Sequence, residues 1–263
     1  MSILRGKTAL VTGASSGLGA DFARVLAARG CHLICVARRV DRLQSLRQEI
    51  VARYPSTVEV IALDLSTPDA AQRLYDRVGG LGMTVDVLIN NAGFGVYGDF
   101  LETPWTRERE MLTLDILTLT HLTKLFAKDM VARDFGYVLL VASVTAYQPT
   151  PSYATYGAAK SFVVNFGEAV SYELRRTGVR VSVLSPGITA TEFLKVTGQK
   201  PTLYERVMMM DSLTVARHGI DGMLRGEPTV VPGWRNAVPA FLLRFVPRRT
   251  AAALADVFMR YGM

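Results

Sequence analysis

The sequence predicts an α/β protein with a doubly wound parallel sheet. Short runs rich in β-branched residues alternate with longer segments of helical period from residue 7 to about residue 185. Most of the short runs are continuously apolar, which is typical of strands that are covered by helices on both faces. Because alternating strands and helices form right-handed βαβ units, this order predicts a parallel sheet between two helical layers.

Each expected element follows from its local pattern. The expected strands are Thr8–Thr12, His32–Ala37, Val58–Leu63, Val85–Ile89, Tyr137–Val141 and Arg180–Leu184. The expected helices span 17–29, 41–53, 68–78, 104–133 and 152–177, and an edge strand is expected at Pro228–Val231. No internal repeat and no Gly/Ser linker divides the chain, so residues 1–263 form one expected domain.

The pattern loosens after Pro186. Residues 191–226 are helical in period but broken, and the tail at 234–263 contains Pro239 and Pro247. In a doubly wound fold, ligands bind beyond the carboxyl ends of the strands. We therefore expect 191–226 to be a substrate lid. For the tail, three readings stay open: packing over the pocket, pairing across a dimer, or contact with an anionic membrane surface.

Composition and charge narrow the class of protein. Of the 263 residues, 49% are hydrophobic and 20% are charged, which excludes disordered, collagen-like and disulfide-scaffold classes. The net charge of +7 fits either anionic partners or simple solubility. The basic residues occur mostly singly or in pairs, without a recognisable nucleic-acid module, so we expect no nucleic-acid partner.

Cysteine usage and the absence of targeting signals predict a soluble cytoplasmic protein. On one strand Cys31 and Cys35 would lie roughly 13 Å apart, too far for a disulfide, so both are expected to be buried thiols in a reducing compartment. The N-terminal segment is unlike a signal peptide. The longest uncharged stretch, Tyr137 to Ala159, is interrupted by Pro149 and Pro151 and is not expected to span a membrane.

A glycine-rich loop joins the first expected strand to the first expected helix. Gly13, Gly17 and Gly19 allow a tight turn and a close approach to a pyrophosphate, which the amides of the following helix would attract. The alternative is an ordinary strand-to-helix turn, but the position between strand and helix is the confirming context for a Rossmann dinucleotide site. The candidate phosphate-binding residues are Gly13, Ser15, Ser16, Gly17, Leu18 and Gly19.

The end of the second strand indicates which coenzyme binds. A carboxylate usually accepts from the ribose 2′-hydroxyl there, but the chain reads Ala37-Arg38-Arg39. Two guanidinium groups could instead bind a 2′-phosphate, which favours NADP(H) over NAD(H). The alternative is a solvated basic turn with Asp41 capping the next helix.

Ser143, Tyr156 and Lys160 are the candidate catalytic residues. Ser143 closes the fifth expected strand, and Lys160 follows Tyr156 by four residues, which places both on one helix face. A nearby ammonium stabilises phenolate and would lower the pKa of Tyr156, making it a usable general acid and base. The alternative is a core tyrosine beside a lysine whose charge reaches solvent.

Five motifs in this order resemble the short-chain dehydrogenase/reductase family, and the basic and apolar tail of the final 70 residues resembles an NADP-preferring subgroup of it. The motifs are Thr12–Gly19, Asp64-Leu65, Asn90–Gly93, Ser143 with Tyr156–Lys160, and Ser185–Thr191. The resemblance covers about residues 5 to 195 and implies a Rossmann fold. It also implies that the protein forms homodimers or homotetramers, for which helices 104–133 and 152–177 could supply the interface.

The resemblance also implies a role for individual residues. Ser143 would hydrogen-bond the substrate oxygen, and Tyr156 and Lys160 would hold the nicotinamide ribose. Asp64 and Leu65 would contact the adenine. The remaining cofactor-binding candidates support the ribose, carboxamide or phosphates: Asn91, Ala92, Gly93, Pro186, Gly187, Ile188, Thr189 and Thr191.

One position departs from the family pattern. The family usually has an asparagine that holds water in a proton relay to the lysine, but this chain has Asp115 there. An ionised aspartate cannot donate a hydrogen bond, and its charge could pair with Lys160 and partly cancel the activation of Tyr156.

The expected function is interconversion of a ketone and a secondary alcohol with NADP(H) on a bulky apolar substrate. Two alternatives stay open: a non-catalytic NADP(H)-binding sensor, and a membrane-associated reductase of lipid-like ketones. The three histidines have no metal-site spacing, and no metal is expected. The expected pocket residues are Phe94, Val96, Tyr97, Gln148, Tyr153, Phe193 and Trp234.

Overall fold

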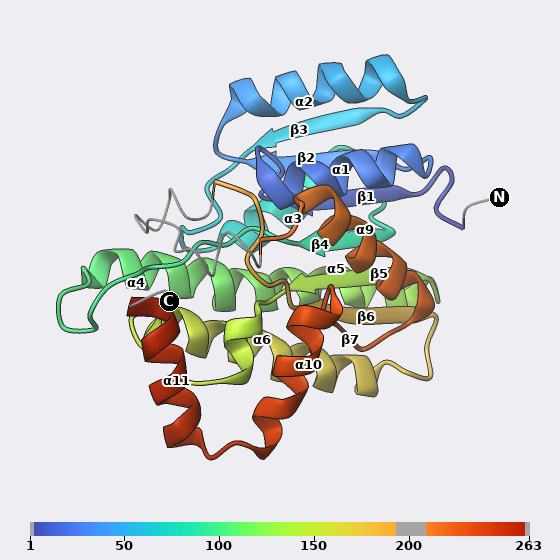
Figure 1. The fold of residues 1–263 in the computed structure, drawn as a ribbon. Coiled ribbons are helices and arrows are strands. Elements are labelled where there is room, and N and C mark those ends of the chain that lie inside the picture. The colour runs from blue at the N-terminus through green and yellow to red at the C-terminus, as the bar shows by residue number, and fades with distance from the viewer. Residues whose placement is uncertain (1–2, 193–208, 261–263) are drawn as a thin grey trace.

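A single sheet of seven parallel strands organises the protein (Figure 1). The computed structural model describes residues 3–192 and 209–260. The strand order is β3-β2-β1-β4-β5-β6-β7. The strands are β1 (Thr8–Thr12), β2 (His32–Ala37), β3 (Val58–Ala62), β4 (Val87–Asn90), β5 (Gly136–Val141), β6 (Val179–Leu184) and β7 (Thr229–Val230). The predicted fold class is confirmed, including the edge strand.

The strand order reverses between β1 and β4. The chain runs outward from β1 to β3 and then returns to start β4 on the other side of β1. In the registers of these strands, Val11 lies opposite both Cys35 of β2 and Ile89 of β4. Ligands of open parallel sheets bind beyond the carboxyl ends of the strands at such a switch point. The ends of β1 and β4 therefore define where a site is expected.

Helices cover both faces of the sheet and enclose two apolar cores. The first core contains side chains of α1 (Gly17–Ala28), α2 (Val40–Arg53) and α9 (Ser212–Arg225). The second contains side chains of α3 (Ala70–Gly80), α5 (Leu119–Ala132) and α6 (Ala154–Glu173). Successive strand residues alternate between the cores: Ala9 and Val11 belong to the first and Leu10 to the second. Burial on both faces explains why most of the strands are apolar almost throughout.

The predicted helix 104–133 is helical but not uniform. It consists of α4 (Trp105–Leu112), a π-helical segment η1 (Thr113–Thr118) and α5. The expectation of an uninterrupted helix is therefore wrong. Isolated π-helical turns are frequent at functional sites, and this one contains the buried Asp115.

The predicted helix 152–177 ends earlier, at Glu173. The chain turns back at Gly178, whose N–H donates to the Asp134 carboxylate at 2.6 Å. A Cβ at Gly178 would overlap the Asp134 carbonyl oxygen, so this approach needs glycine. The helix end is thus set by a contact with a residue more than forty positions away.

The range 191–226, expected to form a lid, divides into two parts. Residues 193–208 lie outside the described residues. The second part contains α9, which packs on α1 and contacts β5 and β6, so it belongs to the helical cover of the sheet. The Asp211 carboxylate caps α9 by accepting from the Thr214 N–H at 2.9 Å, and Gly226 ends the helix with φ +73°. The expectation of a substrate lid in 191–226 stays a prediction.

The tail forms α10 (Trp234–Leu242), a short 3₁₀ turn η3 (Leu243–Phe245) and α11 (Arg248–Arg260). Figure 1 shows α10 and α11 as a hairpin whose turn lies far from the sheet. Trp234 and Phe245 are each 73% exposed. Searched over 3–192 and 209–260, the helices include none with the length and apolar character that crossing a bilayer requires. The three readings of the tail and the oligomeric state stay predictions.

The prediction of buried cysteines is confirmed. Within the described part of the chain Cys31 and Cys35 are both free and fully buried. Burial raises the pKa of each thiol to about 12, so neither forms appreciable thiolate near neutral pH.

Candidate active site

The glycine-rich loop brings the start of α1 to the carboxyl end of β1. Gly13 and Gly17 have φ values of +70° and +51°, a region that favours glycine. A Cβ at Gly19 would overlap the carbonyl oxygen of Gly13, so the turn closes only without a side chain there. Within the described residues, neither a side-chain cap from Ser16 nor an acidic residue occupies the first turn of α1. The positive end of the helix is therefore suited to a phosphate.

Thr12 ties the ends of β1 and β4 together. Its hydroxyl donates to the Ile89 carbonyl at 3.2 Å and accepts from the N–H groups of Asn91 and Ala92, each at 3.0 Å. The Asn91 amide nitrogen donates back to the Thr12 carbonyl at 2.9 Å. These hydrogen bonds hold Asn91 and Ala92, which follow β4, against the end of β1 at the switch point. Thr12 begins the predicted glycine-rich motif, but no role was predicted for its side chain.

Ser143, Tyr156 and Lys160 come together beyond β4 and β5, as the motif spacing predicts. Ser143 follows β5 and begins η2 (Val144–Tyr147), where its hydroxyl accepts from the Thr145 N–H at 3.2 Å. Tyr156, in the first turn of α6, is hydrogen-bonded through its phenol to Ser143. Lys160 Nζ lies 5.6 Å from the centroid of the Tyr156 ring. Tyr156 and Lys160 are both buried.

Asp115 is the nearest charged partner of Lys160. Lys160 Nζ lies 2.9 Å from Asp115 Oδ2 and also donates to the Val141 carbonyl at 3.2 Å. The Asp115 carboxylate is fully buried, and within the described residues the Lys160 ammonium is its ion-pair partner. A Cβ at Gly93 would lie 2.8 Å from Asp115 Oδ1, so glycine lets the chain pass over this ion pair. The structure therefore contains the ion pair between Asp115 and Lys160 that the sequence suggested.

Burial and the nearby charge of Asp115 reverse the expected electrostatics of Tyr156. Burial raises the pKa of the phenol above its usual 10, the Asp115 charge raises it further, and the Ser143 hydrogen bond only partly opposes them. The expectation that Lys160 lowers the pKa of Tyr156 is therefore wrong for this structure. The ammonium is neutralised by a carboxylate that lies closer than the phenol ring. Burial also raises the pKa of Asp115, against the effect of Lys160.

Two residues that sequence reasoning missed hold these side chains in place. Glu108 is buried in α4, where its carboxylate accepts from Thr155 at 2.8 Å and from Thr103 at 3.0 Å. It thereby fixes the first turn of α6 beside Tyr156. The Thr118 hydroxyl donates to the Leu65 carbonyl at 2.8 Å and links η1 to the predicted adenine contact. Nothing in the sequence distinguished Glu108 from the exposed acids of an amphipathic helix.

The loop after β6 crosses the start of α1. Ile188 and Ala190 form backbone hydrogen bonds with Met210, each at 2.9 Å. A Cβ at Gly17 would lie 2.9 Å from Cβ of Thr191, which places Thr191 directly over the glycine-rich loop. Gly187 packs equally closely on Asn236 of α10, a contact with the tail that the sequence did not reveal. The remaining predicted residues of this loop, Pro186 and Thr189, lie between these contacts, and Thr189 donates to the Gly187 carbonyl at 3.0 Å.

The predicted 2′-phosphate residues point in different directions. The Arg39 guanidinium donates to Ser16 at 2.6 Å and to Ser15 at 3.2 Å, so it lies against the glycine-rich loop. Arg38 is 67% exposed in its side chain and lies 3.9 Å from Asp64, whose other oxygen accepts from Ser66. Arg42, which was not among the predicted coenzyme residues, shares the Glu192 carboxylate with Arg39.

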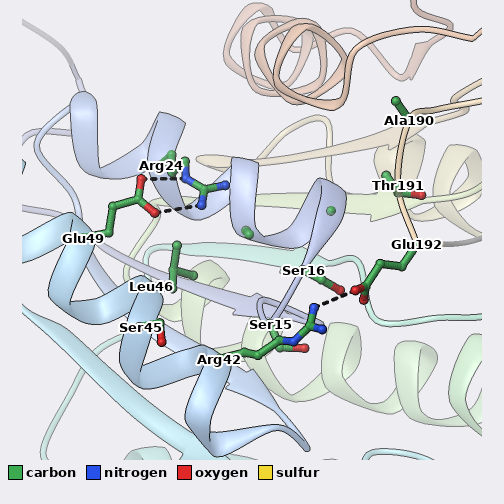
Figure 2. A pocket seen from close by; sticks show the side chains of 12 residues that line it. Ser15, Ser16, Arg24, Arg42, Ser45, Leu46, Glu49, Ala190, Thr191 and Glu192 are labelled. Atoms are coloured by element: carbon green, nitrogen blue, oxygen red, sulfur yellow. Dashed lines mark hydrogen bonds and ion pairs between the residues drawn. The ribbon is translucent and has the colours of Figure 1, made fainter.

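A cavity of about 550 Å³ opens between α1, α2 and the loop after β6. Figure 2 shows Arg42 and Glu192 meeting beside Ser16 at one end, and Arg24 paired with Glu49 at the other. The cavity adjoins the predicted coenzyme residues Ser15, Ser16 and Thr191. The spacing of Arg39 and Arg42, three residues apart at a helix start, was the signal available in the sequence.

The expected substrate-pocket residues are only partly brought together. Phe94, Tyr153 and Tyr156 form a small apolar cluster with Met111, against which Val96 and Tyr97 pack. The Tyr153 ring lies 5.1 Å from Tyr97 and 5.5 Å from Tyr156, centroid to centroid. Gln148 is half-buried outside this cluster, Trp234 is largely exposed, and Phe193 lies outside the described residues.

Three features together define a Rossmann-type oxidoreductase. They are the parallel sheet with its switch point, the uncapped glycine-rich turn, and the cluster of Ser143, Tyr156 and Lys160. Residues 7–202 match the family model for short chain dehydrogenases, and the chain belongs to this family. It is 33% identical over 245 residues to an uncharacterized oxidoreductase of Myxococcus xanthus, covering 92% of this chain and 93% of that protein.

Solved structures agree with this assignment. A structure from a study of 7β-hydroxysteroid dehydrogenase stereoselectivity superposes with a TM-score of 0.86 at 25% identity, covering 96% of this chain and 97% of that one. A short-chain dehydrogenase from Sphingobium yanoikuyae in complex with NADPH superposes with a TM-score of 0.81 at 28% identity, covering 94% and 98%.

Proposed function

We propose that this protein is an NADP(H)-dependent carbonyl reductase that interconverts a bulky ketone and its secondary alcohol. The observation that carries the proposal is the buried phenol of Tyr156, hydrogen-bonded to Ser143 and flanked by Lys160 at the switch point of the sheet. A phenol carries its proton at neutral pH, because its usual pKa is about 10 and burial raises that of Tyr156 further. That protonated form is the one that a reductase needs, because reduction of a carbonyl consumes a proton.

The residues of the site divide the chemical work. The coenzyme, when bound, supplies the hydride that reaches the carbonyl carbon. The Ser143 hydroxyl donates a hydrogen bond to the carbonyl oxygen and stabilises the negative charge that develops there. Tyr156 Oη then gives its proton to that oxygen. Lys160 would hold the nicotinamide ribose and so help to position the coenzyme in the site.

The residues present fit NADP(H). The first turn of α1 offers uncapped amides to the pyrophosphate. No carboxylate follows β2 to accept from a ribose 2′-hydroxyl, and Arg39 lies against Ser15 and Ser16 with Arg42 on the next turn. The likeness to a short-chain dehydrogenase solved in complex with NADPH supports the same proposal, that the chain is one of the NADP-preferring members of the family.

An aromatic wall supports a bulky apolar substrate. Phe94, Tyr97 and Tyr153 lead up to Tyr156, and aromatic side chains of this kind bind large apolar ligands. The likeness to a structure from a study of hydroxysteroid dehydrogenase stereoselectivity supports the same size class.

The direct test follows NADPH absorbance with a panel of ketones that includes a small aliphatic ketone, an aromatic ketone and a steroid ketone. We expect turnover with the larger ketones and little with the smallest. Tight NADPH binding without oxidation on any member of the panel would instead favour a non-catalytic coenzyme-binding protein, which the Asp115 in place of the family asparagine specifically suggests.

Removing the arginines tests the choice of coenzyme. The Arg38→Ala, Arg39→Ala double variant should weaken NADPH binding about ten- to a hundredfold and NADH binding far less, since hydrogen bonds to a charged group are each worth about 1.5–3 kcal/mol. Dissociation constants from quenching of coenzyme fluorescence check this. Arg225→Ala removes an exposed arginine on α9 that pairs with Glu227 and should change neither constant. Equal losses for both coenzymes would contradict the 2′-phosphate argument.

A further inference from the structure

Glu192 places a carboxylate between the two arginines nearest the glycine-rich loop. Its Oε2 accepts from Arg39 at 2.9 Å, and its Oε1 accepts from Arg42 at 2.7 Å. The Ser16 hydroxyl hydrogen-bonds to the same carboxylate. Figure 2 shows Glu192 reaching toward Arg42 and Ser16 from the loop that follows β6. The partners come from segments some 150 positions apart in the sequence.

Unlike an ordinary surface ion pair, Glu192 binds the arginines that are proposed to bind the 2′-phosphate of the coenzyme. Arg39 is the predicted 2′-phosphate residue that lies on Ser15 and Ser16, and one oxygen of Glu192 takes one of its donors. Two guanidinium groups and a serine hydroxyl around one oxyanion are also the partners that a phosphate monoester would use. Glu192 therefore resembles, in charge and in hydrogen bonding, the group that the proposed coenzyme would bring.

The carboxylate keeps its charge under all ordinary assay conditions. Hydrogen bonds from Arg42 and Arg39 lower the pKa of Glu192 to about 2. A negative charge between Arg39 and Arg42 repels an incoming phosphate and competes with it for the same donors. NAD(H), which has a neutral hydroxyl at that position, has no such competition to overcome.

Building on the proposed function, we propose that Glu192 determines coenzyme specificity by occupying Arg39 and Arg42 as an internal substitute for the 2′-phosphate. NADP(H) must displace this carboxylate from the arginines before its 2′-phosphate can bind them, whereas NAD(H) binds without displacing it. The residue thereby lowers the preference for NADP(H) that the two arginines would otherwise give. Thr191, next to Glu192, lies over Gly17, so Glu192 extends from a loop that already contacts the coenzyme-binding turn.

Glu192→Gln tests the inference by equilibrium binding. The substitution keeps the shape of the side chain and removes its charge, and the residue is exposed enough for the fold to tolerate it, which the midpoint of thermal unfolding checks. We expect NADPH to bind about three- to tenfold more tightly, the size that two exposed ion pairs can account for, while NADH binding changes less than about twofold. Adenosine 2′-phosphate should gain as NADPH does, and adenosine 5′-phosphate should not.

Glu49→Gln is the matched control. Glu49 lines the same cavity but pairs with Arg24 at 2.8 Å, so its loss removes the same charge without freeing Arg39 or Arg42. No selective gain for NADPH is expected. Unchanged binding in Glu192→Gln, equal tightening for both coenzymes, or weaker NADPH binding would each overturn the inference.

An error in the proposed coenzyme can be distinguished from an error in the proposed role of Glu192. If the Arg38→Ala, Arg39→Ala variant loses no selectivity for NADPH, the arginines do not bind the 2′-phosphate, and both the coenzyme assignment and this inference are wrong. If that variant loses selectivity but Glu192→Gln gains none, only the role of Glu192 is refuted.

Discussion

Replacing Tyr156 with phenylalanine will reduce ketone turnover with NADPH about 10²- to 10⁴-fold, the usual contribution of a positioned general acid. The variant loses only the hydroxyl that is hydrogen-bonded to Ser143 and keeps the ring that packs on Tyr153 at 5.5 Å. Packing should therefore survive, and NADPH should bind with nearly unchanged affinity. Single-turnover rates and coenzyme fluorescence measure the two effects separately.

Tyr172→Phe provides the comparison within the same helix. Tyr172 lies near the end of α6, is 67% exposed and carries the Arg175 guanidinium 3.7 Å above its ring. Loss of its hydroxyl should leave both turnover and coenzyme binding at the wild-type level. A Tyr156→Phe enzyme that retained most of its turnover would show that another group donates the proton, and the proposed mechanism would be abandoned.

Periodicity predicted the sheet well because burial on both faces leaves a direct mark on the sequence. Residues in runs such as Leu10-Val11 alternate between two apolar cores, so most residues of such a strand are apolar. Element ends were less predictable, since they depend on tertiary contacts. The end of α6 follows from Gly178 lying against Asp134, and the helical cover of the first core includes α9, which is distant in sequence from α1.

The site shows the same division between local pattern and tertiary contact. Motif spacing brought Ser143, Tyr156 and Lys160 together, because a strand end and one helix face fix their relative positions. It did not predict the sign of the shift in the pKa of Tyr156. The main cause of that rise is burial of the phenol, and the charge of Asp115 adds to it. Asp115 lies 2.9 Å from Lys160 in the π-helical segment, where Gly93 leaves room for its carboxylate.

The contacts of Arg38, Arg39 and Arg42 could not be predicted from the local sequence. The basic pair Arg38-Arg39 was visible after the second strand, but the structure turns Arg38 toward Asp64 and brings Arg42 beside Arg39. Glu192 comes from the loop after β6, some 150 positions farther along the chain. No local pattern connects a glutamate after β6 with the start of α2.

Asp115→Asn will move the pH profile of alcohol oxidation to lower pH. Oxidation requires Tyr156 to accept a proton, so its rate rises with pH until the phenol is deprotonated. The Asp115 charge raises the pKa of Tyr156 and therefore holds that rising limb at high pH. Asparagine removes this charge and leaves the Lys160 ammonium without a counter-charge beside the phenol. At a fixed pH on the limb, the rate should rise about tenfold for each unit by which the pKa falls.

The same substitution should also destabilise the fold, which separates electrostatic from structural effects. Lys160 would keep a buried charge with the Val141 carbonyl and the asparagine amide as its acceptors, so the free energy of unfolding in urea should fall. Asp129→Asn, which removes a carboxylate that accepts from Tyr75 at 2.7 Å on α5, should leave the pH profile unchanged. If Asp115→Asn lowers stability without moving the limb, the phenol does not respond to the Asp115 charge.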